Sequence, residues 1–315
     1  MSKYLLRRLL GATVVMWAVA TLVFFMLRAV PGDPFLAMVF DTGDPAAADE
    51  MRRAFGLDDP VYVQYFKYLL QVIQGNLGAS IYGSRVPVST IIAESFPRTI
   101  SLTVLAFTIA VTIAIPAGLI SALYKYSALD HGVTIVAFLG LSMPDFWLAI
   151  LLIITFAAGL GWLPAIGYAP LSSGFGTWLS HLIMPAIAIG TPFAAIIARM
   201  VRSSMLEVLK TEYIQVARSK GLTRWYILLQ HAFPNALIPV ITVMGIALAL
   251  LMAGAVVVEN VFAIKGLGRV LIQGILNRDY PVVQGAILVV SGIFVLSNLV
   301  VDVLYAAIDP RIRYE

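Results

Sequence analysis

Residues 236–258 read ALIPVITVMGIALALLMAGAVVV, a run without one charged side chain. Roughly 20 apolar residues in a helix cross the hydrocarbon layer of a bilayer, so this run is long enough to span it. Lipid offers no hydrogen-bond partner to backbone N–H and C=O groups, and the alternation of a barrel strand is absent. The run therefore predicts a transmembrane helix and indicates an all-α integral membrane protein.

Other apolar runs extend this prediction to six transmembrane helices. In chain order, the predicted spans are Leu9–Leu27, Ile100–Leu123, Val133–Ala158, Leu182–Val201, Ala236–Val258 and Ala286–Ile308. The fourth is the weakest, because Pro185 and Pro192 interrupt it. Of the whole chain, 60% of residues are hydrophobic and 12% are charged, against about a quarter charged in an average soluble domain. This composition excludes most soluble folds.

The distribution of basic residues predicts the orientation of the spans. With the N-terminus inside, the inner segments hold 12 of the 21 basic residues, namely Lys3, Arg7, Arg8, Lys125, Arg199, Arg202, Lys210, Arg218, Lys220, Arg224, Arg311 and Arg313. Cytoplasmic loops carry such an excess of Lys and Arg, so both termini are expected in the cytoplasm. The net charge of +4 could also suggest binding to nucleic acid. The positions of the basic residues instead favour a membrane, so no nucleic-acid partner is expected.

The long segment after the first span contains a predicted surface helix. Asp59 is expected at its N-cap and Pro60 at its first helical position. The residues at helical spacing behind them form one apolar stripe, made of Val61, Tyr65, Tyr68, Leu69 and Val72. We expect this helix to lie along the outer membrane surface or on the bundle, and we favour packing over substrate contact.

These elements predict a division of the chain into four parts. They are a cytoplasmic start with the first span (1–29), an external segment with the amphipathic helix (30–97), a five-helix core that contains a long inner loop (98–308, with the loop at 202–233) and a cytoplasmic tail (309–315). The first span has a basic start and no small-residue cleavage site after it, so we expect it to be retained.

The inner loop has a helical pattern in its middle. Its apolar stripe consists of Met205, Leu206, Leu209, Tyr213, Val216 and Ala217, and Gly221 follows as an expected C-terminal stop. On spacing alone, a helix that docks into another protein and a solvated loop with some helical propensity are equally good interpretations.

The spacing of this loop resembles a known signature. Gln215-Val216-Ala217, three residues, Gly221, nine more residues and His231-Ala232-Phe233-Pro234 follow the register of the signature loop of ABC-importer permeases. That signature is Glu-Ala-Ala, three residues, Gly, nine residues, Ile, any residue, Leu-Pro. Gln215, Val216, His231 and Phe233 depart from its letters.

The resemblance extends over almost the whole chain, to the dipeptide, oligopeptide, nickel and glutathione branch of these permeases. The motifs that carry it, in order, are Tyr4-Leu5-Leu6-Arg7-Arg8-Leu9-Leu10, Val30-Pro31-Gly32-Asp33-Pro34, Phe55-Gly56-Leu57-Asp58, Arg202-Ser203-Ser204-Met205-Leu206-Glu207-Val208-Leu209, Val258-Glu259-Asn260-Val261-Phe262 with Gly266-Leu267-Gly268, Arg278-Asp279-Tyr280-Pro281, and Asp302-Val303-Leu304-Tyr305 with Asp309-Pro310-Arg311.

The resemblance implies a type I ABC-importer permease fold in a bacterial cytoplasmic (inner) membrane. It implies a coupling helix at about Thr211–Gly221, with ATPase-coupling residues Glu212, Gln215, Val216, Ala217, Lys220, Gly221 and Pro234. It implies docking of an external solute-binding protein near Glu259, Lys265, Arg269, Arg278 and Asp279. The implied partners are a second permease and two cytoplasmic ATPases, which would hold the ATP and Mg²⁺.

No cofactor, metal or catalytic residue is expected in the chain itself. A Gly-x-x-x-x-Gly-Lys-Ser/Thr run, which would cradle the phosphates of a nucleotide, is absent from the sequence. The three histidines, His131, His181 and His231, are too dispersed along the predicted topology for a metal site, and the chain has no cysteine.

Asp145 is the best candidate for a charged residue deep in the bilayer, where charge is usually kept for function. It could face the translocation pathway, or it could cap a helix that restarts after Pro144. The runner-up function is an ion-coupled secondary transporter that works without an ATPase, and a passive scaffold is a third. For the importer, a short peptide is the favoured cargo, followed by glutathione and then nickel chelates.

Overall fold

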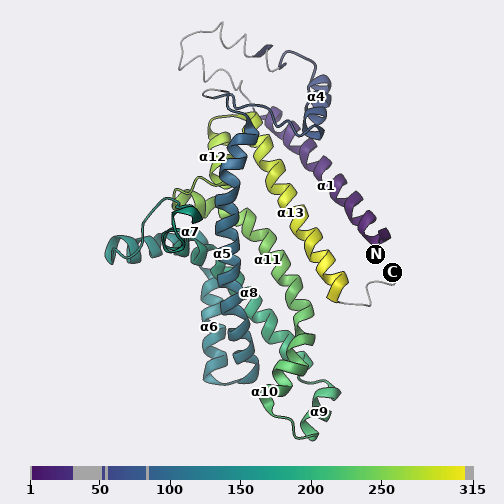
Figure 1. The fold of residues 1–315 in the computed structure, drawn as a ribbon, viewed down its shortest axis with the longest axis vertical. Coiled ribbons are helices and arrows are strands. Elements are labelled where there is room, and N and C mark those ends of the chain that lie inside the picture. Colours follow the sequence, from purple (N-terminus) through teal and green to yellow (C-terminus); the bar gives the residue numbers. More distant parts are fainter. Residues whose placement is uncertain (1, 31–51, 54–55, 83–84, 309–315) are drawn as a thin grey trace. The chain divides into compact units, whose positions relative to one another are not determined.

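The computed structural model describes residues 2–30, 52–53, 56–82 and 85–308. The chain divides into two compact units, which are described separately (Figure 1). Unit 1 contains Met1–Pro97 and Gly266–Ile293, and unit 2 contains Arg98–Lys265 and Phe294–Glu315. The motif residues 31–34, Phe55 and the predicted tail lie outside the described residues.

Long apolar helices account for most of the described chain. Five helical stretches are long and apolar enough to cross a membrane, which confirms the all-α integral membrane class. They fall in α1 (Ser2–Ala29), α5 (Val88–Leu123), α8 (Phe175–Val208), α10 to α11 (Arg224–Tyr226 and Phe233–Val261) and α13 (Tyr280–Ile308). Each helix is longer than its predicted span, because hydropathy detects only the lipid-length part of a helix and misses its more polar ends.

The third predicted span is broken. α6 (Ala128–Ser142) is followed by α7 (Asp145–Leu152) and a π-helical turn, η1 (Ile153–Gly159), and the two parts are bent by 101°. Pro144 has an extended backbone, with ψ at 138°, and has no N–H to continue the hydrogen-bond ladder. The helix expected to restart after Pro144 is present, and the predicted span Val133–Ala158 is divided between the two bent parts. A sixth span is counted only if the bent pair is taken as one.

α8 is the central helix of unit 2. More than half of its most apolar stretch is buried, a larger share than in the other spans, and α6, α7 and α11 pack against it. Small residues allow backbones to approach closely here, as is usual between membrane helices. A Cβ at Gly190 would lie 2.9 Å from the carbonyl oxygen of Ala106 in α5. The low hydropathy of this span therefore reflects contact with protein instead of lipid.

A partly buried ion pair fixes α8 to the start of α6. The guanidinium of Arg202 donates two hydrogen bonds to the carboxylate of Asp130, from Nε at 2.7 Å and from Nη2 at 2.8 Å. Asp130 is buried and also accepts hydrogen bonds from the Ser121 hydroxyl and the Tyr126 N–H. Bidentate geometry of this kind holds two elements in one orientation. The sequence pattern did not reveal this pair, because 72 positions separate the partners.

In unit 1, α4 (Val61–Ile73) packs against the end of α1. Its N-cap is Pro60 and not Asp59, a correction of one position, because the Pro60 carbonyl accepts the first helical hydrogen bonds. The carboxylate of Asp59 instead pairs with Lys67 at 2.6 Å. The rings of Tyr65 and Tyr68 lie 5.3 and 5.4 Å from the ring of Phe24 in α1. Packing is therefore the role of the predicted stripe, although Val61 at its start is exposed.

Replacement of Gly118 should test the close approach of α5 to α8. A Cβ there would lie 2.6 Å from both the carbonyl oxygen of Ala198 and the Cβ of Val201, so Gly118→Ala should cost about 1–3 kcal/mol of unfolding free energy. Thermal unfolding in detergent provides the measurement. Gly132→Ala in α6 is the matched control, because its Cβ meets no atom within 4 Å and alanine favours a helix by up to about 1 kcal/mol. Equal melting temperatures for the two variants would contradict the close approach.

Asp130→Asn should leave the Arg202 cation partly buried without its anion. We expect a loss of about 3 kcal/mol of unfolding free energy, since breaking a buried pair leaves an uncompensated charge. Asp58→Asn is the control, because the Arg52–Asp58 pair is 3.8 Å apart and exposed and should be worth less than about 1 kcal/mol. Urea or thermal unfolding measures both variants. If Asp130→Asn loses no more unfolding free energy than Asp58→Asn, the Arg202–Asp130 pair does not stabilise the fold.

Candidate functional site

A short helix, α9 (Glu212–Ser219), comes between α8 and α11 in the chain. It lies at the bottom of the view in Figure 1, beyond the ends of these two helices. α8 ends at Val208, and a tight turn follows in which the N–H groups of Lys210 and Thr211 bond to the carbonyls of Glu207 and Val208. Thr211 has an extended backbone at the N-cap, and its hydroxyl bonds back to the Val208 carbonyl at 2.6 Å. The helix that was predicted at about Thr211–Gly221 is therefore present.

α9 has one buried and one exposed face. Ile214 and Ala217 are buried, whereas Tyr213 and Val216 are exposed. The single apolar stripe predicted from Met205 to Ala217 was wrong, because the turn after Val208 changes the chain direction and restarts the helical register. Polar and charged side chains share the exposed face with Tyr213 and Val216, namely Glu212, Gln215 and Lys220.

Gly221 ends α9 in the left-handed region, with φ at +76°. Its N–H bonds to the Arg218 carbonyl at 2.9 Å. A Cβ built on Gly221 would meet no atom within 4 Å. Glycine is therefore favoured by backbone conformation and not by crowding, as the sequence pattern predicted.

Side chains tie α9 to the start of α11. The Tyr213 hydroxyl donates to the His231 carbonyl at 3.3 Å, and the Asn235 amide donates to Tyr213 Oη and to the His231 carbonyl at 3.1 and 2.8 Å. Pro234 is exposed in the first turn of α11, where its missing N–H leaves no intrahelical bond unmade. Sequence reasoning missed Asn235, whose position one residue after the signature Pro234 was a usable signal.

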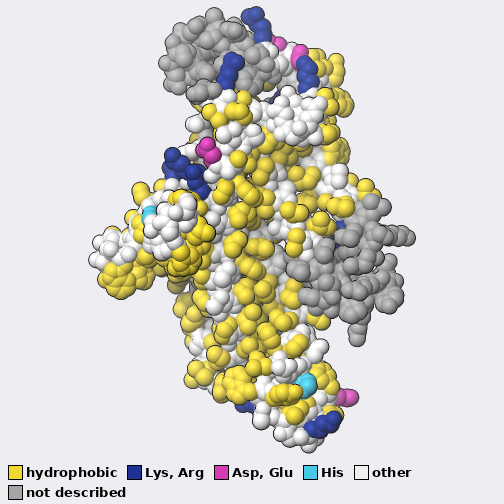
Figure 2. Space-filling model, in the orientation of Figure 1, with side chains coloured by type: hydrophobic (Ala, Val, Ile, Leu, Met, Phe, Trp, Pro, Cys, Tyr) yellow, Lys and Arg dark blue, Asp and Glu magenta, His cyan; other side chains and the backbone are white. Residues whose placement is uncertain are grey.

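A second link joins the loop to α5. Arg224, at the start of α10, donates a hydrogen bond to the carbonyl of Leu123, the last residue of α5. Beside it lies a cavity of about 380 Å³, lined by Leu123, Leu209, Arg218, Leu222, Arg224, Ile227 and Leu228. The Arg202–Asp130 pair joins the same region to α8, which precedes α9 in the chain. The α5–α6 turn is therefore bonded both to the helix before α9 and to the helix after it. Figure 2 shows hydrophobic side chains over α5 and α6 and a group of charged side chains near α9.

Asp145 begins α7 directly after the break. It occupies the first helical position and not the N-cap, which is Pro144. Its carboxylate is half-buried and accepts a hydrogen bond from the Phe146 N–H at 2.8 Å. The side chain thus accepts from an N–H of the first helical turn, as an N-cap side chain does. It does so from the first helical position, one residue after the N-cap. Its role in a pathway stays a prediction.

The residues predicted near a docked binding protein divide by charge. In unit 2, Glu259 is fully buried and accepts a hydrogen bond from the Thr99 hydroxyl at 2.5 Å, while Lys265 is exposed. In unit 1, Asp279 is buried and accepts from the Ser80 hydroxyl and the Ile81 N–H, while Arg278 is exposed and Arg269 is half-buried. Within each unit the acid is thus engaged in internal hydrogen bonds, and the cations reach the surface.

Among the described residues, no group of three or more His, Asp or Glu side chains could hold a metal ion.

Two family models match the chain. Residues 114–314 match the model described as binding-protein-dependent transport system inner membrane component, and residues 1–103 match the model of the N-terminal part of such membrane components. The first match contains α9 and all of its anchors in α8 and α11.

Curated relatives match over the full length of both chains. A Brucella abortus protein that carries the name peptide transport system permease is 45% identical over 100% of each chain. The oligopeptide transport system permease protein AppB of Bacillus subtilis is 38% identical, and the glutathione transport system permease protein GsiC of Escherichia coli is 40% identical, again over 100% of each chain.

A solved structure shares the fold. The inward-facing MetNI methionine ABC transporter aligns with a TM-score of 0.58 at 22% identity, over 70% of this chain and 96% of that one. The likeness supports the type I permease fold expected from the sequence. From these matches and the membrane-spanning helices, the chain belongs to the family of inner membrane components of binding-protein-dependent transport systems, and it is a multi-pass permease subunit of an ABC transporter.

Proposed function

We propose that this chain forms half of the translocation pathway of an ATP-driven importer for short peptides, and that α9 transmits force from a cytoplasmic ATPase. The observation that carries the proposal is α9 itself. It presents an exposed face of mixed apolar and polar side chains, yet specific hydrogen bonds of Thr211 and Tyr213 hold its N-terminal end to α8 and to the start of α11. Such a helix can bind a partner and move as a rigid piece.

The surface around α9 has the composition of a docking site. Tyr213, Val216, Leu222 and Trp225 are exposed large hydrophobic residues, and aromatic anchors of this kind dominate many protein interfaces. Arg218 and Lys220 are also exposed and could pair with acidic groups of an ATPase. Rim pairs of this type are worth only about 0–1 kcal/mol each, so we assign the affinity to the apolar anchors.

The proposed complex contains a second permease, two ATPase subunits that hold ATP and Mg²⁺, and an external binding protein. Both termini of this chain are proposed to lie in the cytoplasm of a bacterium, with α9 on the same side. For the binding protein, we propose contacts with the exposed cations Lys265 and Arg278, and with the half-buried Arg269. Glu259 and Asp279 would support those regions from inside each unit, since both are buried.

The names of the relatives support the cargo class. They include peptide, oligopeptide and glutathione transport permeases. A short peptide is therefore our first choice of cargo, glutathione the second and nickel chelates the third. The ion-coupled carrier is disfavoured, because family membership supports an ATP-driven system. Asp145 remains our proposal for a pathway residue, on its half-buried position at the helix break.

Gly221→Ala should impair coupling. Alanine at φ +76° is strained by about 1–2 kcal/mol, which α9 can relieve only by shifting its C-terminal end. We expect lower ATPase stimulation by loaded binding protein in a reconstituted complex that assembles normally. Gly176→Ala is the control, because this glycine in the first turn of α8 has equally open surroundings without a positive φ. Stimulation equal to that of the Gly176→Ala complex would contradict the lever.

Peptide uptake in proteoliposomes tests the function as a whole. The complete complex should accumulate a labelled short peptide only when the ATPase side is supplied with ATP, because this chain has no phosphate-binding loop of its own. A proton or sodium gradient without nucleotide should drive no uptake. Uptake by the chain alone under such a gradient would replace our proposal with the ion-coupled carrier.

A further inference from the structure

α4 has a second apolar stripe, which is largely exposed. Tyr62, Phe66, Leu70 and Ile73 are 67%, 66%, 57% and 82% exposed. Their spacing, at positions i, i+4, i+8 and i+11, places them on one side of the helix. This side differs from the one that Tyr65 and Tyr68 turn toward α1.

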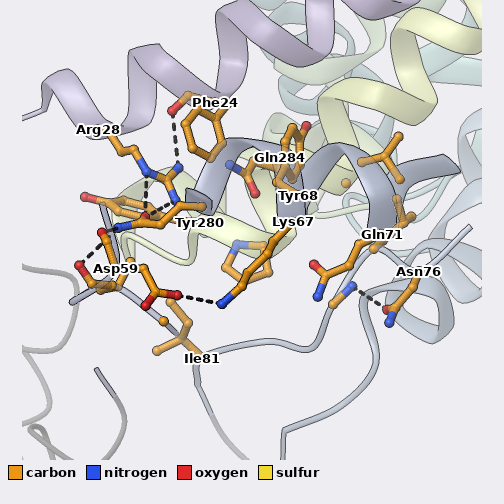
Figure 3. A pocket seen from close by; sticks show the side chains of 18 of the residues that line it. Phe24, Arg28, Asp59, Lys67, Tyr68, Gln71, Asn76, Ile81, Tyr280 and Gln284 are labelled. Atoms are coloured by element: carbon orange, nitrogen blue, oxygen red, sulfur yellow. Dashed lines mark hydrogen bonds and ion pairs between the residues drawn. The ribbon is translucent and has the colours of Figure 1, made fainter. Parts of the chain in front are cut away.

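The polar residues of α4 lie on the remaining side. Gln64, Lys67 and Gln71 line a cavity of about 660 Å³ in unit 1. Figure 3 shows Lys67 and Gln71 projecting there, with Lys67 paired to Asp59. α4 therefore separates its exposed apolar side chains from its charged and amide side chains, which is the pattern of helices that lie in a membrane surface.

The contacts with α1 set the depth of α4. The hydroxyl of Tyr65 lies 2.8 Å from that of Thr21, and Arg28 donates two hydrogen bonds to the Gln64 amide oxygen. α1 has its membrane-spanning stretch at Arg7–Ala29. At about 1.5 Å per residue, Thr21 lies roughly 12 Å below Ala29 along the helix. α4 therefore runs beside the last turns of a span, at the level where lipid chains meet headgroups.

The exposed stripe is also continuous with the surface of α1. Phe25 on α1 is exposed within the stretch that is long and apolar enough to span the membrane, so we expect it to face lipid. Its ring lies 5.5 Å from the ring of Tyr65, which in turn lies 5.6 Å from the ring of Phe66. An unbroken row of aromatic rings therefore leads from the lipid-facing side of α1 onto the exposed side of α4, and aromatic residues favour this depth of a bilayer.

We propose that α4 is a membrane-embedded interfacial helix whose Tyr62, Phe66, Leu70 and Ile73 side chains insert among the lipids at the membrane boundary where α1 ends. The lipid surface is the partner of this face. The inference does not depend on the proposed cargo or on the proposed coupling role of α9.

Nitroxide labels can test this, because the chain contains no cysteine and single-cysteine variants need no background changes. Phe66→Cys and Ile73→Cys report on the apolar side, and Gln71→Cys is the matched control on the polar side of the same helix. Leu22→Cys on α1, 61% exposed, is the lipid reference, and Asn277→Cys, exposed between α12 (Leu267–Leu276) and α13, is the aqueous reference. The full-length protein is placed in phosphatidylcholine nanodiscs, and collisions with oxygen and with a water-soluble nickel chelate are measured.

Labels at 66 and 73 should collide with oxygen in preference to nickel, as at position 22, with a ratio several-fold above that at position 71. A nickel-dominated ratio at 66 and 73, equal to that at position 277, would overturn the proposal in favour of a water-exposed face. Low accessibility to both reagents would overturn it in favour of a face covered by protein. Ile73→Cys supplies an independent answer if Phe66→Cys folds poorly, because Ile73 is 82% exposed.

Discussion

The main constraint on this protein is that lipid cannot hydrogen-bond to a polypeptide backbone. Helices satisfy their own N–H and C=O groups, so they can cross the bilayer, and every interruption has to be compensated locally. At the break before α7, the Asp145 carboxylate meets the N–H of Phe146. At the end of α8, the Thr211 hydroxyl and the turn hydrogen bonds perform the same role. At these two interruptions of the helices, a nearby polar side chain thus forms a hydrogen bond with the backbone.

The same constraint explains where the buried charges lie. The buried Asp130 carboxylate pairs with Arg202 and also accepts from the Ser121 hydroxyl and the Tyr126 N–H. Glu259 and Asp279 each accept a hydrogen bond from a neighbouring hydroxyl. A carboxylate in such surroundings fixes the relative position of the elements that supply its donors. The acids therefore hold their own units together through internal hydrogen bonds.

Much of the fold could be predicted from the sequence, because hydropathy and proline reflect local physics. The spans, the break at Pro144 and the left-handed Gly221 are all set within a few residues. The true ends of α5 and α13, and the two-sided character of α9, could not be read in this way, since they depend on the direction that a turn gives to the chain. The Arg202–Asp130 pair depends on packing between α6 and α8, which no single local pattern contains. For the candidate site, the position of α9 was predicted, and its anchors Asn235 and Arg224 were not.

The anchors determine what a displacement of α9 would do. Tyr213 and Asn235 join it to α11, while Arg224 joins α10 to the end of α5, and Arg202 joins α8 to the start of α6. A helix held by the covalent chain alone would absorb a push by bending its flanking turns. Because these hydrogen bonds are directional, and those of Arg202 and Arg224 are partly buried, we expect a push on α9 to be shared among four helices of unit 2. Force applied at the exposed side chains of this short helix would therefore reach the packed centre around α8, as the coupling that we propose requires.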